Sequence, residues 1–194
     1  MEKTNGKLAE KLSESGVLLA IGIALSYALP FGGMWPQGGS VTICSTLPIV
    51  WLSYKYGVKW GLLSGFTHAL LKIAIGGLAE VLGWGMTVPA VVGSMFLDYV
   101  VAFSIIGIAG IFRGKFNNNR PLEIGLGCIL GLTLRFVSHF IAGCLLYSSW
   151  AWEGWSVPTY SAAYNSGYMG PEIILTTTAA VILVNLPAFK SNLD

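Results

Sequence analysis

The sequence predicts an all-α integral membrane protein, a bundle of six transmembrane helices. Of its 194 residues, 54% are hydrophobic and only 10% are charged, whereas soluble domains carry about 25% charged residues. The apolar residues gather in six runs. Apolar runs of about 20 residues are typical of helices that cross a bilayer, because backbone inside lipid must satisfy its own hydrogen bonds.

The six predicted helices follow one another without a domain linker or a low-complexity tract. We therefore expect a single membrane domain over residues 1–194. The second run is short and follows a glycine-rich segment, and the last two runs are long enough to tilt or protrude. The predicted helices lie near residues 15–31, 41–56, 59–78, 88–112, 122–149 and 159–188.

Lysine and arginine mark one side of the predicted bundle. They precede the first span, follow the last, and occupy the connections between spans two and three and between spans four and five. The opposite connections, around residues 32–40, 79–87 and 150–158, contain neither residue. Because cytoplasmic loops carry an excess of Lys and Arg, this pattern predicts that both termini are cytoplasmic. The charged amino-terminal segment has no cleavable signal pattern.

Composition and motifs disfavour several functions. The formal net charge is only +2, without the clustered basic residues of a nucleic-acid binder. The chain contains neither a phosphate-binding G-x-x-x-x-G-K-[ST] loop nor an H-E-x-x-H or G-x-S-x-G motif, so we expect neither ATP hydrolysis nor an enzyme. No metal site or cofactor is expected, since the cysteines lack metal-type spacing. These are Cys44, Cys128 and Cys144.

The segment "GGMWPQGGS", residues 32–40, connects the first two spans on the predicted outer side. Four glycines, one proline and no charge suit neither a helix nor an ordinary polar loop. Such a segment could fold over the mouth of the bundle as a gating loop, which would bring Trp35 onto a bound molecule.

Ionisable residues inside the predicted spans mark a candidate binding site, because charges in a bilayer normally face the bundle interior or an aqueous cavity. At 1.5 Å per residue, Asp98 and His139 lie about ten residues from the outer ends of their helices, near the level of Tyr160 and Asn165. A buried carboxylate favours a cation, and aromatic faces attract cations and stack on flat rings. The set suits a small, flat, heteroaromatic cation. The candidate aromatic residues are Trp35, Tyr99, Tyr147, Tyr160 and Tyr164.

Structural roles stay open for some of these residues. Asp98 could pair with Arg135 or Lys72, and Glu172 is expected to interact with Arg135 rather than with a ligand. His68 and Lys72 share a helical face and fit an internal polar network. Three further aromatic residues fit the belt that Trp and Tyr form at membrane interfaces. These are Trp150, Trp152 and Trp155.

Small residues recur every four positions along the first span, at Gly16, Ala20, Ala24 and Ala28. Such a stripe lets a second helix approach closely. The second helix could belong to the bundle itself or to a partner protein, and the spacing leaves both alternatives open.

Four motifs together resemble the thiamine-specific S component of energy-coupling factor (ECF) transporters. They are "WPQGGS" at 35–40, "LDYVVAF" at 97–103, "LRFVSHFIAG" at 134–143 and "YSAAYNSGYMGPE" at 160–172. The resemblance implies a six-helix protein of the bacterial cell membrane that binds thiamine from outside with high affinity. It also implies a transmembrane coupling subunit and two ATPase subunits as partners, with the alanine stripe docking on the coupling subunit.

The resemblance also assigns the ligand-binding residues. Trp35 of the gating loop would cover the thiazolium, and Asp98 would contact the cation beside Tyr99. Tyr160 and Asn165 would hydrogen-bond the aminopyrimidine. Asp98 and Tyr147 differ from the Glu and Trp of the family pattern. The remaining pocket positions implied by the resemblance are Arg135, His139, Gly143, Tyr147 and Ser161.

Three alternatives stay open at this point. The chain could be an S component for another vitamin or precursor, such as hydroxymethylpyrimidine. An intramembrane hydrolase would use the buried Asp98, His139 and serines. A passive channel is disfavoured, because glycine and proline over one mouth and aromatic residues beneath it favour enclosure.

Overall fold

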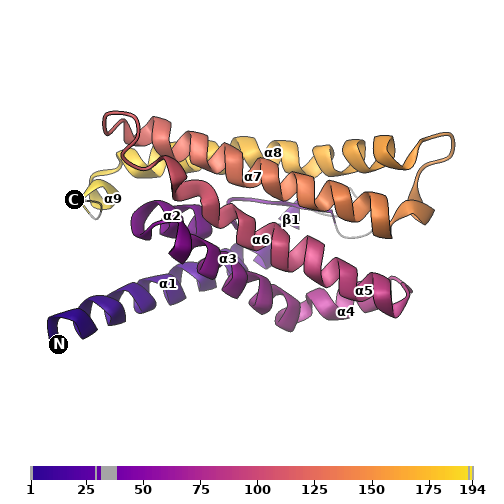
Figure 1. Cartoon of the computed structure of the whole chain (residues 1–194), viewed down its shortest axis with the longest axis horizontal. Coiled ribbons are helices and arrows are strands. Elements are labelled where there is room, and N and C mark those ends of the chain that lie inside the picture. Colours follow the sequence, from indigo (N-terminus) through magenta and orange to yellow (C-terminus); the bar gives the residue numbers. More distant parts are fainter. Residues whose placement is uncertain (1, 29, 32–38, 192, 194) are drawn as a thin grey trace.

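The structure, a computed structural model, consists mainly of helices that run along the long axis of the molecule (Figure 1). It describes residues 2–28, 30–31, 39–191 and 193. Within these residues, four helical stretches are long and apolar enough to cross a membrane, as predicted for the third to sixth runs. The four stretches are Val58–Gly83, Val88–Phe112, Arg120–Leu146 and Val157–Asn185.

The first two helices differ in length from the spans predicted for them. Helix α1 (Glu2–Ala28) begins well before the predicted start at residue 15, and its amino-terminal end diverges from the other helices (Figure 1). The predicted span 41–56 contains a short strand and a turn before α2 (Leu47–Tyr56). Ten helical residues rise only about 15 Å, half of the bilayer's hydrocarbon core. Helix α2 is therefore too short to cross a bilayer by itself.

Two short strands flank the glycine-rich segment. Strand β1 (Pro30–Phe31) pairs antiparallel with β2 (Val41–Thr42), with Pro30 opposite Thr42. The pairing brings the two ends of this segment together beside α1. Residues 32–38, including Trp35, lie outside the described residues, so the predicted gating role of Trp35 stays a prediction.

The third and fourth runs each contain a π-helical stretch. The third run consists of α3 (Val58–Lys72), the π-helical η2 (Ile73–Gly77) and α4 (Leu78–Gly83). The fourth consists of α5 (Val88–Ser94), the π-helical η3 (Met95–Val101), α6 (Ala102–Ser104) and the 3₁₀-helical η4 (Ile105–Phe112). The two π-helical stretches contact each other at Gly77 of η2 and Tyr99 of η3. The contact is so close that a Cβ added at Gly77 would lie only 2.5 Å from the Tyr99 ring. Such π-helical turns occur frequently at functional sites.

The last two long helices, α7 (Arg120–Leu146) and α8 (Val157–Asn185), lie side by side along most of their length (Figure 1). Each begins after a capping side chain, since Asn119 accepts a hydrogen bond from the backbone of Leu122 and Ser156 accepts one from Thr159. The short η5 (Ser148–Trp150) lies in their connection, and α9 (Pro187–Lys190) follows α8.

The two ends of the bundle differ in chemistry. The end that contains α2 holds a tightly packed apolar core and several basic residues. Arg113 donates to the backbone carbonyls of Tyr54 and Lys55, and Arg120 donates to that of Lys190. The opposite end, where α7 connects to α8, contains a cavity. The core includes Ile49, Leu52, Ile106, Leu132 and Met169, all fully buried.

Candidate functional site

A cavity of about 270 Å³ lies between α1, the third and fourth runs, α7 and α8. Its volume is near the lower end of the range for small-molecule sites. The structure brings the described candidate residues from the sequence together around this one cavity, although they come from three helices far apart in the chain. The candidates that line it are Asp98, Tyr99, Arg135, His139, Gly143, Tyr147, Tyr160, Ser161 and Asn165.

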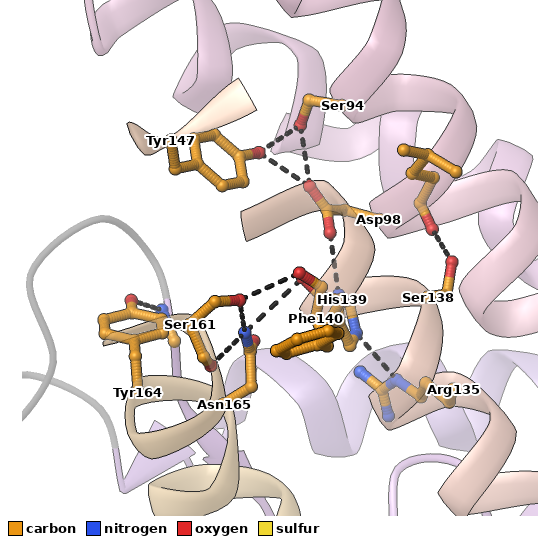
Figure 2. Close-up of polar contacts among 12 residues, drawn as sticks. Ser94, Asp98, Arg135, Ser138, His139, Phe140, Tyr147, Ser161, Tyr164 and Asn165 are labelled. Atoms are coloured by element: carbon orange, nitrogen blue, oxygen red, sulfur yellow. Dashed lines mark hydrogen bonds and ion pairs between the residues drawn. The ribbon is translucent and has the colours of Figure 1, made fainter. Parts of the chain in front are cut away.

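The carboxylate of Asp98 lies at the centre of a hydrogen-bond network (Figure 2). Its Oδ2 accepts hydrogen bonds from the Tyr147 hydroxyl at 2.6 Å and from Ser94 Oγ at 3.2 Å. Its Oδ1 lies 2.8 Å from Nδ1 of His139. The expected alternative, a direct pair with Arg135 or Lys72, is not formed among the described residues.

The hydrogen bonds of His139 define where its proton lies. Arg135 Nε lies 3.2 Å from His139 Nε2, and an arginine side chain can only donate (Figure 2). Nε2 must therefore accept, and the imidazole proton lies on Nδ1, from which it is donated to Asp98. All three partners of the Asp98 carboxylate are then uncharged donors. Among the described residues, the Asp98 carboxylate therefore has no directly bonded cationic partner at the cavity wall.

Asn165 and Ser161 of α8 hold the neighbouring helix as well as lining the cavity. Ser161 Oγ donates to the carbonyl of Phe140 at 2.9 Å, and Asn165 Nδ2 donates to the carbonyl of Ser161 at 2.8 Å. Asn165 Oδ1 accepts a hydrogen bond from the Tyr168 hydroxyl at 2.6 Å. The amide nitrogen of Asn165 is thus occupied by acceptors within the protein. Its Oδ1 has two lone pairs and accepts only one of these hydrogen bonds, so one lone pair remains for a ligand.

Aromatic side chains form the wall beside Asp98. The rings of Tyr147 and Trp150 are stacked, with centroids 5.2 Å apart and an interplanar angle of 9°. Trp84 lies edge-on to both rings. Trp150, expected in the interfacial belt, also lines the cavity, because η5 places its ring on that of Tyr147 just after α7 ends. Trp152 and Trp155 are 40% and 44% exposed, which fits the expected belt.

Tyrosines at four-residue spacing form a second wall along α8. Tyr160, Tyr164 and Tyr168 contact one another in sequence, with ring centroids 5.7 and 6.0 Å apart. The Tyr164 hydroxyl accepts a hydrogen bond from the backbone of Gly39, at the end of the glycine-rich segment. Tyr168 was not among the predicted site residues, although its spacing from Tyr164 places it on the same helix face.

Lys72 and Glu80 line the cavity on the side nearest α1. Lys72 donates to Ser26 Oγ at 3.2 Å, and its ammonium lies 4.2 Å from the centroid of the Tyr27 ring. Glu80 falls within the predicted outer connection 79–87. It lines the cavity because the helix continues through Gly83, beyond the predicted end at residue 78. The irregular turn η2, with a non-helical backbone at Gly76, separates Lys72 from Glu80, so an α-helical spacing does not predict that both face the cavity.

Glu172 and Arg135 attract each other electrostatically, as expected, but no direct hydrogen bond or ion pair joins them. The fully buried carboxylate of Glu172 instead accepts a hydrogen bond from the backbone of Thr42 at 3.0 Å. Glu172 thereby ties β2 to the middle of α8, a contact between distant segments that the sequence does not reveal. His68, expected beside Lys72 in a polar network, is fully buried with its ring 4.9 Å from that of Phe103.

The stripe of small residues on α1 faces away from the bundle. Ala20, Ala24 and Ala28 are exposed, whereas Leu19 and Ser26 on the opposite side of the helix are buried. Of the two alternatives for the stripe, this exposure disfavours packing within the bundle.

These features define a helical membrane protein with a polar cavity between its helices. Residues 12–190 match the family described as "Thiamine transporter protein (Thia_YuaJ)", and the chain belongs to this family. The resemblance noted in the sequence is thereby confirmed, and the family is one of transporters rather than enzymes.

Known proteins resemble the chain over nearly its whole length. It is 32% identical over 181 residues to the thiamine transporter ThiT of Bacillus subtilis, which covers 89% of each chain. It is 23% identical to the thiamine transporter ThiT of Lacticaseibacillus paracasei over 185 residues, 89% of this chain and 86% of the relative. A solved structure of ThiT from Listeria monocytogenes shares the fold, with a TM-score of 0.78 at 19% identity over 94% of this chain and 97% of that one.

Proposed function

We propose that this protein is the thiamine-binding S component of an ECF-type importer, which captures thiamine from outside the cell. The observation that carries the proposal is the Asp98 carboxylate, held by uncharged donors at the wall of a cavity rich in aromatic rings. In a member of a thiamine transporter family, such a group is placed to balance a permanently charged ligand.

The chemistry of thiamine matches the two ends of this site. Its thiazolium ring carries a fixed positive charge, and a charge pair about 4 Å apart near a protein surface is worth about 4 kcal/mol. The Tyr147 and Trp150 rings lie beside Asp98 and can add about 0.5–2 kcal/mol of cation–π attraction. The aminopyrimidine ring would meet Tyr160 and the free lone pair of Asn165 Oδ1.

The proposal includes the arrangement of the chain in the membrane. One domain over residues 1–194 has six membrane segments, in which α1 and the β2–α2 segment complete the four long helical stretches. Both termini and the basic end of the bundle lie in the cytoplasm, which is supported by the distribution of Lys and Arg. The membrane is the bacterial plasma membrane, and the cavity then opens toward the outside.

Transport requires partners, because the sequence contains no phosphate-binding loop that could hydrolyse ATP. We propose that a transmembrane coupling subunit docks on the exposed stripe of Ala20, Ala24 and Ala28, and that two ATPase subunits drive release of thiamine to the cytoplasm. Exposure of the stripe and its small side chains support this role, since they allow close helix approach.

Isothermal titration of the purified protein with thiamine, hydroxymethylpyrimidine and riboflavin tests the ligand. We expect tight binding of thiamine. The variant Asp98→Asn should lose about 2–5 kcal/mol of thiamine binding, the usual cost of removing one partner of a buried charge pair. Glu153→Gln removes an exposed carboxylate outside the cavity and should bind as the unchanged protein does.

The same titration separates the main alternative. A component specific for hydroxymethylpyrimidine would bind the uncharged pyrimidine more tightly than thiamine and would tolerate Asp98→Asn. Tight binding of riboflavin without thiamine binding would exclude the proposed substrate.

A further inference from the structure

We propose that Arg135 is a positioning residue that keeps His139 neutral, so that Asp98 retains its full negative charge for a cationic ligand. The inference rests on the proposed function and adds a role for Arg135 that differs from direct ligand contact. The three residues form a chain from the guanidinium through the imidazole to the carboxylate (Figure 2).

The geometry leaves the imidazole one protonation state. Arg135 and His139 lie four residues apart on α7, so their side chains meet on one face of the helix. Arg135 Nε donates to His139 Nε2 at 3.2 Å, and Nδ1 lies 2.8 Å from Asp98 Oδ1. A second proton on Nε2 would remove the hydrogen bond from Arg135 and would set two cations against each other. The guanidinium does not lose its own proton in proteins, so this block persists at every physiological pH.

Protonation of His139 would change what a ligand meets. An imidazolium beside Asp98 would form an ion pair with no net charge, and the attraction for a cation would fall accordingly. Among the described residues, the imidazole nitrogens of His139 form hydrogen bonds only with Arg135 and Asp98. Tyr168 of α8 faces the imidazole only with its ring edge, at a centroid distance of 5.9 Å. The remaining charged or titratable groups on the cavity wall include Lys72, Glu80, Tyr99 and Tyr147.

The surroundings of Arg135 support a role in the network. Its guanidinium carbon lies 4.6 Å from the centroid of the Phe103 ring, which holds the group beside His139. Its Nη1 is buried without a hydrogen-bond partner among the described residues. A buried donor without an acceptor costs about 1–3 kcal/mol. Packing alone therefore does not account for an arginine here, whereas control of His139 does.

The test is the pH dependence of thiamine affinity between pH 8 and pH 5.5, measured by titration calorimetry. The unchanged protein should vary by less than about threefold. Arg135→Met should bind more weakly at pH 8 and should lose further affinity at pH 5.5, beyond the variation of the unchanged protein. A further loss is expected because His139 Nε2, no longer bonded to Arg135, can bind a proton as the pH falls.

Two further variants separate the protonation effect from a loss of structure. Arg135→Lys keeps a charged donor and should retain the flat profile. Arg135→Gln preserves polarity and hydrogen bonding, but its amide can turn so that its oxygen accepts a hydrogen bond from a protonated Nε2, so this variant should acquire the pH dependence. Adding His139→Gln to Arg135→Met should abolish that dependence.

The matched control is Arg113→Met, because Arg113 lies at the opposite end of the bundle. The thiamine affinity of this variant should not depend on pH. A flat profile for both Arg135→Met and Arg135→Gln would overturn the inference while leaving thiamine binding intact. Failure of the unchanged protein to bind thiamine would instead overturn the proposed function. The two failures are therefore distinguishable.

Discussion

At the scale of single residues, the site combines a charge with rings that shape its surroundings. Tyr147 contributes in both ways, because its hydroxyl donates to Asp98 and its ring stacks on Trp150. Tyr147→Phe removes only the hydroxyl and should weaken thiamine binding by less than about tenfold. Tyr147→Leu also removes the aromatic face and should cost more than tenfold, since stacking and cation–π contacts are each worth about 0.5–2 kcal/mol. Titration calorimetry of both variants checks this, and equal losses would show that the hydroxyl dominates.

The sequence could predict the central residues of this site but not their partners. A carboxylate such as Asp98 inside an apolar helix is conspicuous, because burying a charge is costly without a purpose. Ser94 carries no such signal, and its contact with Asp98 follows from one turn of helix. Trp150 reaches the cavity through the turn after α7, which a hydrophobicity pattern does not specify. Glu80 was missed because the predicted helix ended too early.

At the scale of helices, close approach of α7 and α8 positions both sides of the cavity. Gly143 permits it, since a Cβ at this position would lie 2.1 Å from Ser161 Oγ. Gly143→Ala should lower stability by about 1–3 kcal/mol through overpacking and should weaken thiamine binding. Thermal unfolding in detergent and calorimetry measure the two effects. Adding Ser161→Gly should restore stability. Gly16→Ala in α1, whose new Cβ would have nothing within 4 Å, should be neutral or slightly stabilising; a similar loss there would contradict the packing argument.

The sequence predicted the bounds of a helix well where an apolar run of membrane length has polar residues at both ends, and less well elsewhere. The fourth predicted helix, 88–112, coincides with Val88–Phe112 because its apolar run and its polar flanks agree. The π-helical η2 and η3 depend on contacts between distant segments, such as Tyr99 against Gly77, and leave no local signature. The second predicted span is helical only over Leu47–Tyr56, for a related reason. Residues 41–56 are apolar because they are buried among other helices, and burial in protein resembles burial in lipid.

At the scale of the whole molecule, α1 borders the cavity at Ser26 and Tyr27, whereas the alanine stripe of the same helix is exposed and does not line the cavity. Ala24 is exposed on α1, whereas the described candidate ligand-binding residues come from the fourth run, α7 and α8. Capture of the ligand and docking of a partner should therefore be separable. A bulky side chain at position 24 would keep a second helix at a distance without touching the cavity.

Ala24→Trp should block co-purification with the coupling subunit and abolish uptake of thiamine by cells, while thiamine affinity of the isolated protein stays within about twofold. Ile141→Trp is the matched control, because Ile141 is also exposed in a membrane-length helix, yet lies on α7 away from the stripe. It should leave both binding and assembly intact. Normal assembly of Ala24→Trp would show that the partner docks elsewhere. Loss of assembly in both variants would instead indicate a general sensitivity to bulk at the lipid-facing surface, and the stripe would have no special role.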